Sequence, residues 1–105
     1  MSFGLMGADM QPQGHAQMLV RLADYGQNPQ AAADGPRWKV FSGRQIAVEH
    51  ALSPQVVAQL AALGHEVRHT ERWNMEYGAA QLIYRVDGGY VAASDPRRDG
   101  QAVGF

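Results

Sequence analysis

The residues HEVRH, positions 65–69, match the H-E-x-x-H pattern of zinc proteases letter for letter. In those enzymes the spacing works because a helix stacks positions i and i+4 on one face, within reach of one ion. Here Gly64 marks the expected end of a preceding helix, and apolar and polar residues alternate as in a strand. Four residues of strand span about 13 Å, too far for two histidines to share one zinc. We therefore expect a half-exposed strand, no metal and no other cofactor, and keep a zinc hydrolase as an alternative.

A second stretch with residues suited to chemistry is GLMGADMQPQGHAQM, positions 4–18. Two small residues, Gly7 and Ala8, precede the acid Asp9 and a polar run in which a helix is expected to start. Backbone N–H groups fixed near a helix start can bind a reacting oxyanion. The alternative interpretation is a turn that only changes the direction of the chain.

Acyl transfer also needs an activated nucleophile and a base. The sequence has one threonine, Thr70, four serines and no cysteine. No serine lies in a G-x-S-x-G elbow. Ser53 is better explained as a helix cap, and Ser94 as part of a turn. The sequence therefore holds no self-contained catalytic constellation.

The composition bounds the function classes. The chain has 105 residues, which we interpret as a single domain over 1–105. Nine basic and ten acidic residues give a net charge of −1, which argues against nucleic acid or an anionic membrane as a partner. No apolar run approaches the roughly 20 residues that a membrane helix needs. No signal peptide is visible, so we expect a cytoplasmic location by default.

Hydrophobic periodicity and turn residues predict the elements that position these stretches. Three helices are expected at 15–25, at 29–34 behind an Asn28 cap, and at 54–63 behind a Ser53 cap. Gly26 and Gly64 fit the positions that follow helix ends. Strands are expected at 44–50, 65–70, 79–86 and 89–94, with a hairpin turn at 87–89 and a turn-rich tail at 95–105.

This order predicts an α+β fold in which helices pack on one face of a small, mostly antiparallel sheet. The second face of that sheet is partly apolar, because Ile83 lies there together with Tyr90 or Val91 of the next strand. An apolar patch of this kind calls for a partner. A small homodimeric binding or assembly module is therefore an alternative to an enzyme.

Four segments together resemble the C-terminal end of the γ-glutamyltransferases, which are N-terminal-nucleophile hydrolases. They are MGADMQPQGH, LADYGQNPQAAADGPRW, VVAQLAALGHEV and AAQLIYRVDGGYVAASDPRRDGQAVGF. The resemblance covers nearly all 105 residues. It implies that the fold is part of an αββα sandwich and that the chain corresponds to roughly the second half of the family's small subunit.

The resemblance implies an enzyme whose precursor cleaves itself, so that the new N-terminal threonine is the nucleophile and its own α-amino group is the base. Such enzymes pass γ-glutamyl groups from glutathione-like substrates to water or an amino acid, often in the periplasm or after secretion. The threonine and the residues that hold the glutamyl group would lie upstream. We therefore expect this chain to be inactive alone, with the missing upstream segment or a second copy as its partner.

The resemblance also gives Gly7 and Ala8 a role. The family uses a Gly-Gly pair at the matching positions, whose N–H groups bind the tetrahedral oxyanion. This chain departs from the family with alanine at the second position. Alanine keeps its N–H but resists positive φ, so the site is compromised if a left-handed residue is needed there. Without the upstream half, we expect the turn to be idle in this chain.

Five polar residues in family-like segments need an interpretation. For Asp9 we favour a helix N-cap over a contact with substrate, since aspartate is common before helices. For Arg37, Gln81, Asp95 and Arg97 we favour structural roles over catalysis. Asp95 is expected to cap the turn that follows it, and the arginines to tie loops by hydrogen bonds.

Overall fold

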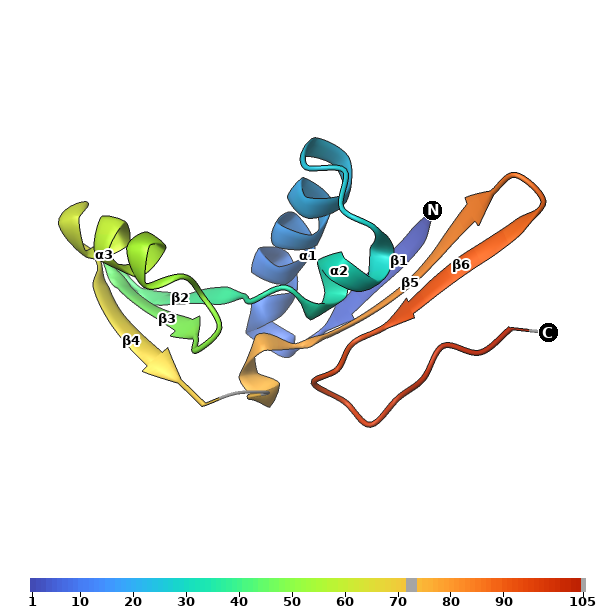
Figure 1. The fold of residues 1–105 in the computed structure, drawn as a ribbon. Helices are drawn as coiled ribbons and strands as arrows, with labels where there is room; N and C mark the ends of the chain where they lie inside the picture. The colour runs from blue at the N-terminus through green and yellow to red at the C-terminus, as the bar shows by residue number, and fades with distance from the viewer. Residues whose placement is uncertain (72–73, 105) are drawn as a thin grey trace.

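The computed structural model describes residues 1–71 and 74–104. Its elements are β1 (Ser2–Met6), the 3-10 turn η1 (Ala8–Met10), α1 (Gln11–Leu19), the π-helical turn η2 (Val20–Asp24), α2 (Pro29–Asp34), β2 (Trp38–Ser42), β3 (Gln45–Glu49), α3 (Pro54–Ala62), β4 (Glu66–Thr70), the 3-10 turn η3 (Met75–Tyr77), β5 (Ala79–Val86) and β6 (Gly89–Ser94). The α+β class is confirmed. The molecule is elongated, with extents of 48 × 26 × 21 Å (Figure 1).

The strands form two small sheets and not the single sheet that the sequence predicted. One is antiparallel in the order β1-β5-β6, and the other has the order β2-β3-β4, with β2 and β3 antiparallel and β3 and β4 parallel. The two strands that completed these sheets, β1 and β2, were not predicted. Each satisfies its backbone groups against a strand that the sequence did predict, β5 or β3.

The helices α1 and α2 cover one face of the β1-β5-β6 sheet (Figure 1). The register pairs Leu5 with Ala80 and Leu82 with Ala93, so these four side chains share that face. They form the core together with Met10, Met18, Ala32, Ala33, Ala47 and Tyr77, all buried. Alanines at the contact let α2 lie close against β5 and β6. We call this part of the molecule the covered sheet.

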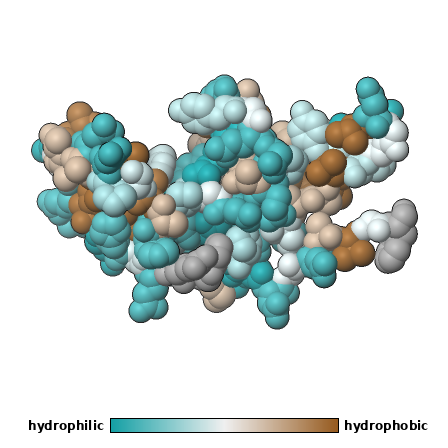
Figure 2. All heavy atoms as spheres, viewed as in Figure 1, coloured by the Kyte–Doolittle hydropathy of each residue, from teal (hydrophilic) through white to brown (hydrophobic). Residues whose placement is uncertain are grey.

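The second part is the small β2-β3-α3-β4 unit, in which α3 connects two parallel strands. Only β3 is well buried here, with Ile46, Ala47, Val48 and Glu49 each less than a tenth exposed. None of the residues of α3 is buried. Figure 2 shows hydrophobic side chains at the surface of this end of the molecule and along the β5–β6 hairpin. None of the described helices is long and apolar enough to cross a membrane.

Local signals set several boundaries as predicted. The side chain of Asn28 accepts a hydrogen bond from Ala31 N at 2.9 Å, and Pro29 opens α2. Ser53 occupies the N-cap position of α3, but its side chain makes no capping hydrogen bond. The first predicted helix begins earlier than expected, at Gln11, and continues through η2 to Asp24.

The hairpin between β5 and β6 is confirmed, with Gly88 at φ +83° in its turn. Arg85 pairs with Tyr90, which places Tyr90 and not Val91 on the same face as Ile83. Ile83 is 53% exposed and Tyr90 74% exposed, so the second face of the sheet is partly apolar, as predicted. The tail has a turn after β6 and no helix or strand as far as residue 104; position 105 lies outside the described residues.

Candidate functional site

The turn at Gly7 and Ala8 joins β1 to α1. Met10 N donates to the Gly7 carbonyl at 2.9 Å, which is the first hydrogen bond of the helical turn. The N–H groups of Ala8 and Asp9 come before this donor in the chain, so they have no carbonyl within the helix to bond to. Ala8 and Asp9 are exposed. Two backbone donors are therefore presented at the start of a helix, where the helix dipole favours negative charge.

Ala8 is left-handed, with φ +47°, and among the described residues it is the one non-glycine with positive φ. The left-handed region costs alanine roughly 1–2 kcal/mol. The concern raised by the sequence was that alanine would not adopt this conformation. In the structure the backbone of Ala8 does adopt it, so alanine in place of the family's glycine does not prevent a left-handed residue at this position.

Gly7 and Gly78 pack backbone against backbone at this turn. A Cβ on Gly7 would lie 2.9 Å from Gly78 Cα, which is closer than real contacts allow. Gly78 has φ +74°, and a Cβ there would lie 2.5 Å from the Met6 carbonyl oxygen. Both positions therefore require glycine, and the start of β5 fits directly against the end of β1.

Asp9 is not a helix cap, so the favoured prediction for it is wrong. The N-cap of η1 is Gly7 and that of α1 is Met10, and neither makes a side-chain capping bond. The helical turn begins at Ala8, one residue before Asp9, which places the aspartate inside the turn. An acid in the first turn still interacts favourably with the helix dipole.

His15 ties the helix to the strand beside the turn, a role the sequence did not indicate. Leu5 N donates to His15 Nε2 at 3.2 Å, and His15 Nδ1 lies 2.7 Å from the Gln11 carbonyl. Because Nε2 accepts, Nδ1 carries the proton and donates to Gln11. The bond between Leu5 N and His15 Nε2 crosses from β1 to α1, and no local sequence pattern encodes it.

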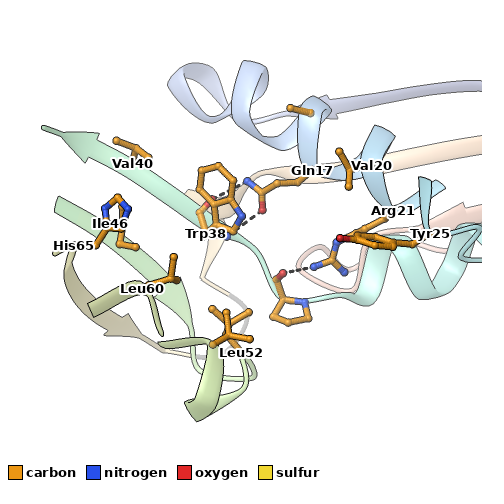
Figure 3. A pocket seen from close by; sticks show the side chains of 13 residues that line it. Gln17, Val20, Arg21, Tyr25, Trp38, Val40, Ile46, Leu52, Leu60 and His65 are labelled. Atoms are coloured by element: carbon orange, nitrogen blue, oxygen red, sulfur yellow. Dashed lines mark hydrogen bonds between the residues drawn. The ribbon is translucent and has the colours of Figure 1, made fainter. Parts of the chain in front are cut away.

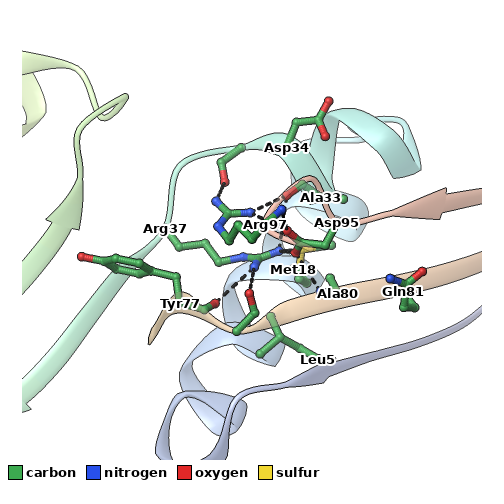
Figure 4. A network of polar contacts seen from close by, with 12 residues as sticks. Leu5, Met18, Ala33, Asp34, Arg37, Tyr77, Ala80, Gln81, Asp95 and Arg97 are labelled. Carbon is green, nitrogen blue, oxygen red and sulfur yellow. Dashed lines mark hydrogen bonds and ion pairs between the residues drawn. The ribbon is translucent and has the colours of Figure 1, made fainter. Parts of the chain in front are cut away.

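Four charged side chains, those of Arg37, Glu49, Asp95 and Arg97, are buried together in the interior; Figure 4 shows Arg37, Asp95 and Arg97. Asp95 accepts from Arg37 Nη2 at 2.6 Å and from Arg97 Nη1 at 3.0 Å. Arg97 Nε donates to Glu49 at 2.7 Å, and its Nη2 also pairs with Glu49. We call this group the ion cluster. Buried charges are tolerated only when they are paired in this way.

The ion cluster also binds the backbone of several segments. Asp95 accepts from Ala80 N at 2.7 Å and from Arg97 N at 2.9 Å, and the second of these bonds closes the turn after β6. Arg97 donates to the Ala33 and Gly35 carbonyls at the end of α2. The predicted turn bond of Asp95 and the predicted hydrogen bonds of the arginines to loops are present in the structure. At the surface, Gln81 Nε2 donates to Ser94 Oγ at 3.0 Å, which links β5 to β6.

The pKa values within the cluster follow from burial and pairing. Burial opposes ionisation of Asp95, but the Ala80 N–H and the two arginine charges outweigh it, so the pKa of Asp95 is lowered. Burial acts to lower the pKa of Arg97, and the hydrogen bond and charge of Glu49 outweigh it, so that pKa is raised. Burial and the nearby Arg97 charge lower the pKa of Arg37.

Among the described residues, the only threonine has no hydrogen bond to a group that could act as its base. Thr70 Oγ1 lies 2.8 Å from the Tyr77 hydroxyl and 3.3 Å from the Val48 carbonyl. Burial raises the pKa of Tyr77, although the Thr70 hydrogen bond opposes this, so the phenol stays protonated at neutral pH and cannot take a proton from Thr70. This arrangement is a structural link between β4 and η3.

Residues 65–69 do not form a zinc motif. Glu66–Thr70 is strand β4, as predicted, and β4 pairs in parallel with β3. The helical stacking that H-E-x-x-H needs is therefore missing, which argues against the zinc-hydrolase alternative. In the described ranges 1–71 and 74–104 no three potential metal-binding side chains (His, Cys, Asp or Glu) gather.

An apolar hollow of about 560 Å³ lies between the α1–η2 helix and the small β2-β3-α3-β4 unit (Figure 3). Its walls include Val20, Trp38, Ile46, Leu52 and Leu60. The Gln17 side chain spans one wall, where it donates to the Trp38 carbonyl at 2.8 Å and accepts from Trp38 N at 3.1 Å. None of Gly7, Ala8 or Asp9 lines this hollow, so it is separate from the turn.

Comparisons with known proteins agree on one family. The sequence model described as Gamma-glutamyltranspeptidase matches residues 1–105. The chain is 31% identical over 98% of its length to the glutathione hydrolase-like YwrD proenzyme of Bacillus subtilis (strain 168). It is 32% identical over its whole length to the oxamate amidohydrolase proenzyme of Klebsiella pneumoniae. In both cases it covers 21% of the relative.

Solved structures give the same result. The cephalosporin acylase from Bacillus halodurans matches 94% of this chain with a TM-score of 0.87 and 40% identity, and the match covers 19% of that protein. The gamma-glutamyltranspeptidase from Pseudomonas nitroreducens complexed with L-DON matches 98% of this chain and 53% of that chain, with a TM-score of 0.78 and 25% identity.

Proposed function

This chain belongs to the gamma-glutamyltranspeptidase family of N-terminal-nucleophile hydrolases, and from that premise we propose that it provides the oxyanion-binding turn of an enzyme that hydrolyses or transfers acyl groups of amides. It spans about a fifth of the length of the curated relatives it matches. We propose that a companion segment provides the nucleophilic threonine. The chain by itself then has no turnover.

The observation that carries this proposal is the conformation of the turn. Ala8 is held left-handed at the start of a helix, and the N–H groups of Ala8 and Asp9 precede the helical ladder. Donors fixed in this way need no reorganisation when charge develops on a carbonyl oxygen. One such donor is worth about 3–4 kcal/mol of transition-state stabilisation in comparable enzymes.

The proposed chemistry divides between two segments. The threonine of the companion attacks the amide carbonyl carbon, and its α-amino group takes the hydroxyl proton. The carbonyl oxygen becomes an oxyanion, and the backbone N–H groups presented at the Gly7–Ala8 turn stabilise it. Collapse of this intermediate breaks the C–N bond, and the amine leaves with the proton from the α-amino group. Water or an amino acid then accepts the acyl group.

The relatives support a substrate class only where their activities agree, which is on the cleavage of amide bonds. The relatives are named as glutathione hydrolase-like, amidohydrolase and acylase proteins, and these activities differ in the acyl group of the substrate. We propose γ-glutamyl compounds first, because the matching family model is that of the gamma-glutamyltranspeptidases. Asp9 stays a proposed substrate contact, since it is exposed and one residue from Ala8.

The claim that this chain has no turnover without its companion segment is tested with the purified chain and γ-glutamyl-p-nitroanilide. We expect no release of p-nitroaniline and no acyl adduct in the intact mass spectrum. Thr70→Val is the matched variant, because it removes the only threonine hydroxyl. Turnover by rigorously pure chain, or an adduct that Thr70→Val abolishes, would contradict the proposal.

A homodimeric assembly module is a second candidate, supported by exposed Ile83 and Tyr90 on the free face of the covered sheet. Sedimentation equilibrium over a wide concentration range tests it. A dimer that Ile83→Lys dissociates supports this candidate. A monomer at high concentration argues against it and leaves the companion segment as the proposed partner.

A further inference from the structure

Arg37 lies behind the Gly7–Ala8 turn and holds the segment on which the turn rests. Its side chain is 1% exposed. One guanidinium nitrogen, Nη1, donates to two consecutive carbonyls, those of Tyr77 and Gly78, both at 3.2 Å. The other, Nη2, is fixed by Asp95 at 2.6 Å (Figure 4). The planar guanidinium therefore sets the orientation of the chain that enters β5.

The backbones of Gly78 and Gly7 pack directly against each other, so the position of Gly78 determines the position of the turn. The site of a Cβ on Gly7 is 2.9 Å from Gly78 Cα and 3.5 Å from Gly78 N. On its other side, a Cβ on Gly78 would lie 2.5 Å from both the Met6 carbonyl oxygen and Leu5 Cδ2, so only glycine fits between β1 and the turn. A shift of Gly78 away from the turn would leave a void beside Gly7, and a shift toward it would force the turn to move.

The left-handed conformation of Ala8 needs such support. Alanine adopts positive φ only where the surrounding structure over-determines it. On the helical side, the turn is fixed by the Met10 N–H bond to Gly7 and by the fully buried Met10 side chain. On the strand side, the fixed neighbour is Gly78, which Arg37 holds.

We propose that Arg37 is a positioning residue for the Gly7–Ala8 turn, acting through the carbonyl of Gly78. Its guanidinium anchors Gly78, and Gly78 keeps Gly7 in the place from which Ala8 enters the helix left-handed. Lysine cannot replace it. A single ammonium nitrogen cannot donate to two carbonyls and a carboxylate that are spaced to match the two terminal nitrogens of a planar guanidinium. Only the catalytic consequence rests on the proposed function; the conformational claim stands on the contacts above.

The test reads the Ala8 backbone directly by NMR on the full chain. Positive φ brings the amide proton and the Hα of the same residue close together, so the wild-type chain shows an unusually strong intraresidue NOE at Ala8. We expect this NOE to weaken several-fold in Arg37→Lys, with the Met10 methyl and α1 cross-peaks still native-like. Arg85→Lys, on an exposed position of β5, is the matched control and is expected to keep the NOE.

A second measurement needs no folded variant. In the wild-type chain, the amides of Met10 and Ala80 both have defined partners, Gly7 O and Asp95 Oδ2. If the turn rests on the segment that the ion cluster holds, native-state hydrogen exchange shows the two amides opening in the same cooperative step. If Arg37→Lys fails to fold, this comparison decides the question.

The NMR and exchange measurements separate the proposal from its alternatives. Loss of the Ala8 NOE in folded Arg37→Lys, or joint opening of Met10 and Ala80, supports the proposal. A folded Arg37→Lys chain that keeps the NOE, or a Met10 amide that opens at much lower cost than Ala80, overturns it. No readout depends on turnover, so failure here is distinct from failure of the proposed acyl chemistry.

Discussion

The covered sheet and the small β2-β3-α3-β4 unit are stabilised in different ways. The covered sheet buries a continuous apolar core under α1 and α2, including Leu5, Met18 and Leu82. In the small unit only β3 is buried, and Leu63 after α3 is 74% exposed. Burial of apolar area is the main favourable term in folding, so the covered sheet carries most of the stability.

The ion cluster lies where these two regions meet. Arg37 precedes β2 and Glu49 ends β3, whereas Asp95 and Arg97 follow β6. The small unit is therefore attached to the covered sheet by paired charges and by the hydrogen bonds of those charges to the backbone. Such a junction fails as a whole, because removal of one partner leaves the others buried and unpaired.

The largest expected effect comes from Asp95→Asn. The substitution leaves Arg37 and Arg97 without their shared carboxylate, and breaking a buried pair costs about 3–5 kcal/mol. Small domains have a total stability of about 5–15 kcal/mol, so a large share of the free energy of unfolding should be lost. Urea denaturation followed by circular dichroism measures the loss. Asp99→Asn, at an exposed position, should stay within about 0.5 kcal/mol of the wild type.

A matched pair of leucines compares the two regions themselves. Leu82→Ala in the covered sheet should cost about 2–5 kcal/mol, because the side chain is 2% exposed and packed in the core. Leu60→Ala in α3 should cost less than half as much, since Leu60 is only half-buried. Equal losses in urea denaturation would mean that the two regions are equally well packed.

Acid should weaken the junction through Asp95. Its pKa is lowered in the folded chain, so the unfolded chain binds more protons as the pH falls. The stabilisation is fully present above the ordinary aspartate pKa of about 3.9 and is lost progressively below it. Urea midpoints at neutral pH, pH 5 and pH 3 give the profile. A midpoint at pH 3 that equals the neutral value would show that Asp95 contributes nothing.

The smallest expected effect is a stabilisation, from Ala8→Gly. Glycine removes a left-handed strain of roughly 1–2 kcal/mol but restores about 0.4–1 kcal/mol of freedom to the unfolded chain. The net gain should lie between about 0 and 1.6 kcal/mol and appear as a slightly higher Tm. A clear destabilisation would mean that the alanine methyl group makes a contact worth more than the strain.

The sequence predicted those elements whose signals are local. Asn28 with Pro29 marked the start of α2, the alternation around Val67 marked β4, and the turn at 87–89 marked the last hairpin. Strand β1, SFGLM, was missed because its five residues contain a glycine and no strong β pattern. Its pairing with β5 comes from residues far along the chain.

The candidate site was predictable only in part. The resemblance placed the turn at Gly7 and Ala8, but the left-handed state of Ala8 runs against the preference of alanine. What supports that state, Gly78, is far away in the sequence. The partner of Arg37 in the ion cluster, Asp95, is 58 residues distant, and no spacing rule connects them. The predicted cap at Asp9 failed because the helix begins one residue earlier than its composition indicates.

The most direct test of the central claim replaces the matching part of the Bacillus halodurans cephalosporin acylase with residues 1–105, since the two share 40% identity. The chimera then carries the rest of the acylase and the turn of this chain. In Ala8→Val the β-branched residue resists positive φ and moves the N–H, so kcat should fall about 10²-fold with little change in KM. Ala8→Gly should keep the rate. An Ala8→Val chimera as fast as its parent would contradict the account.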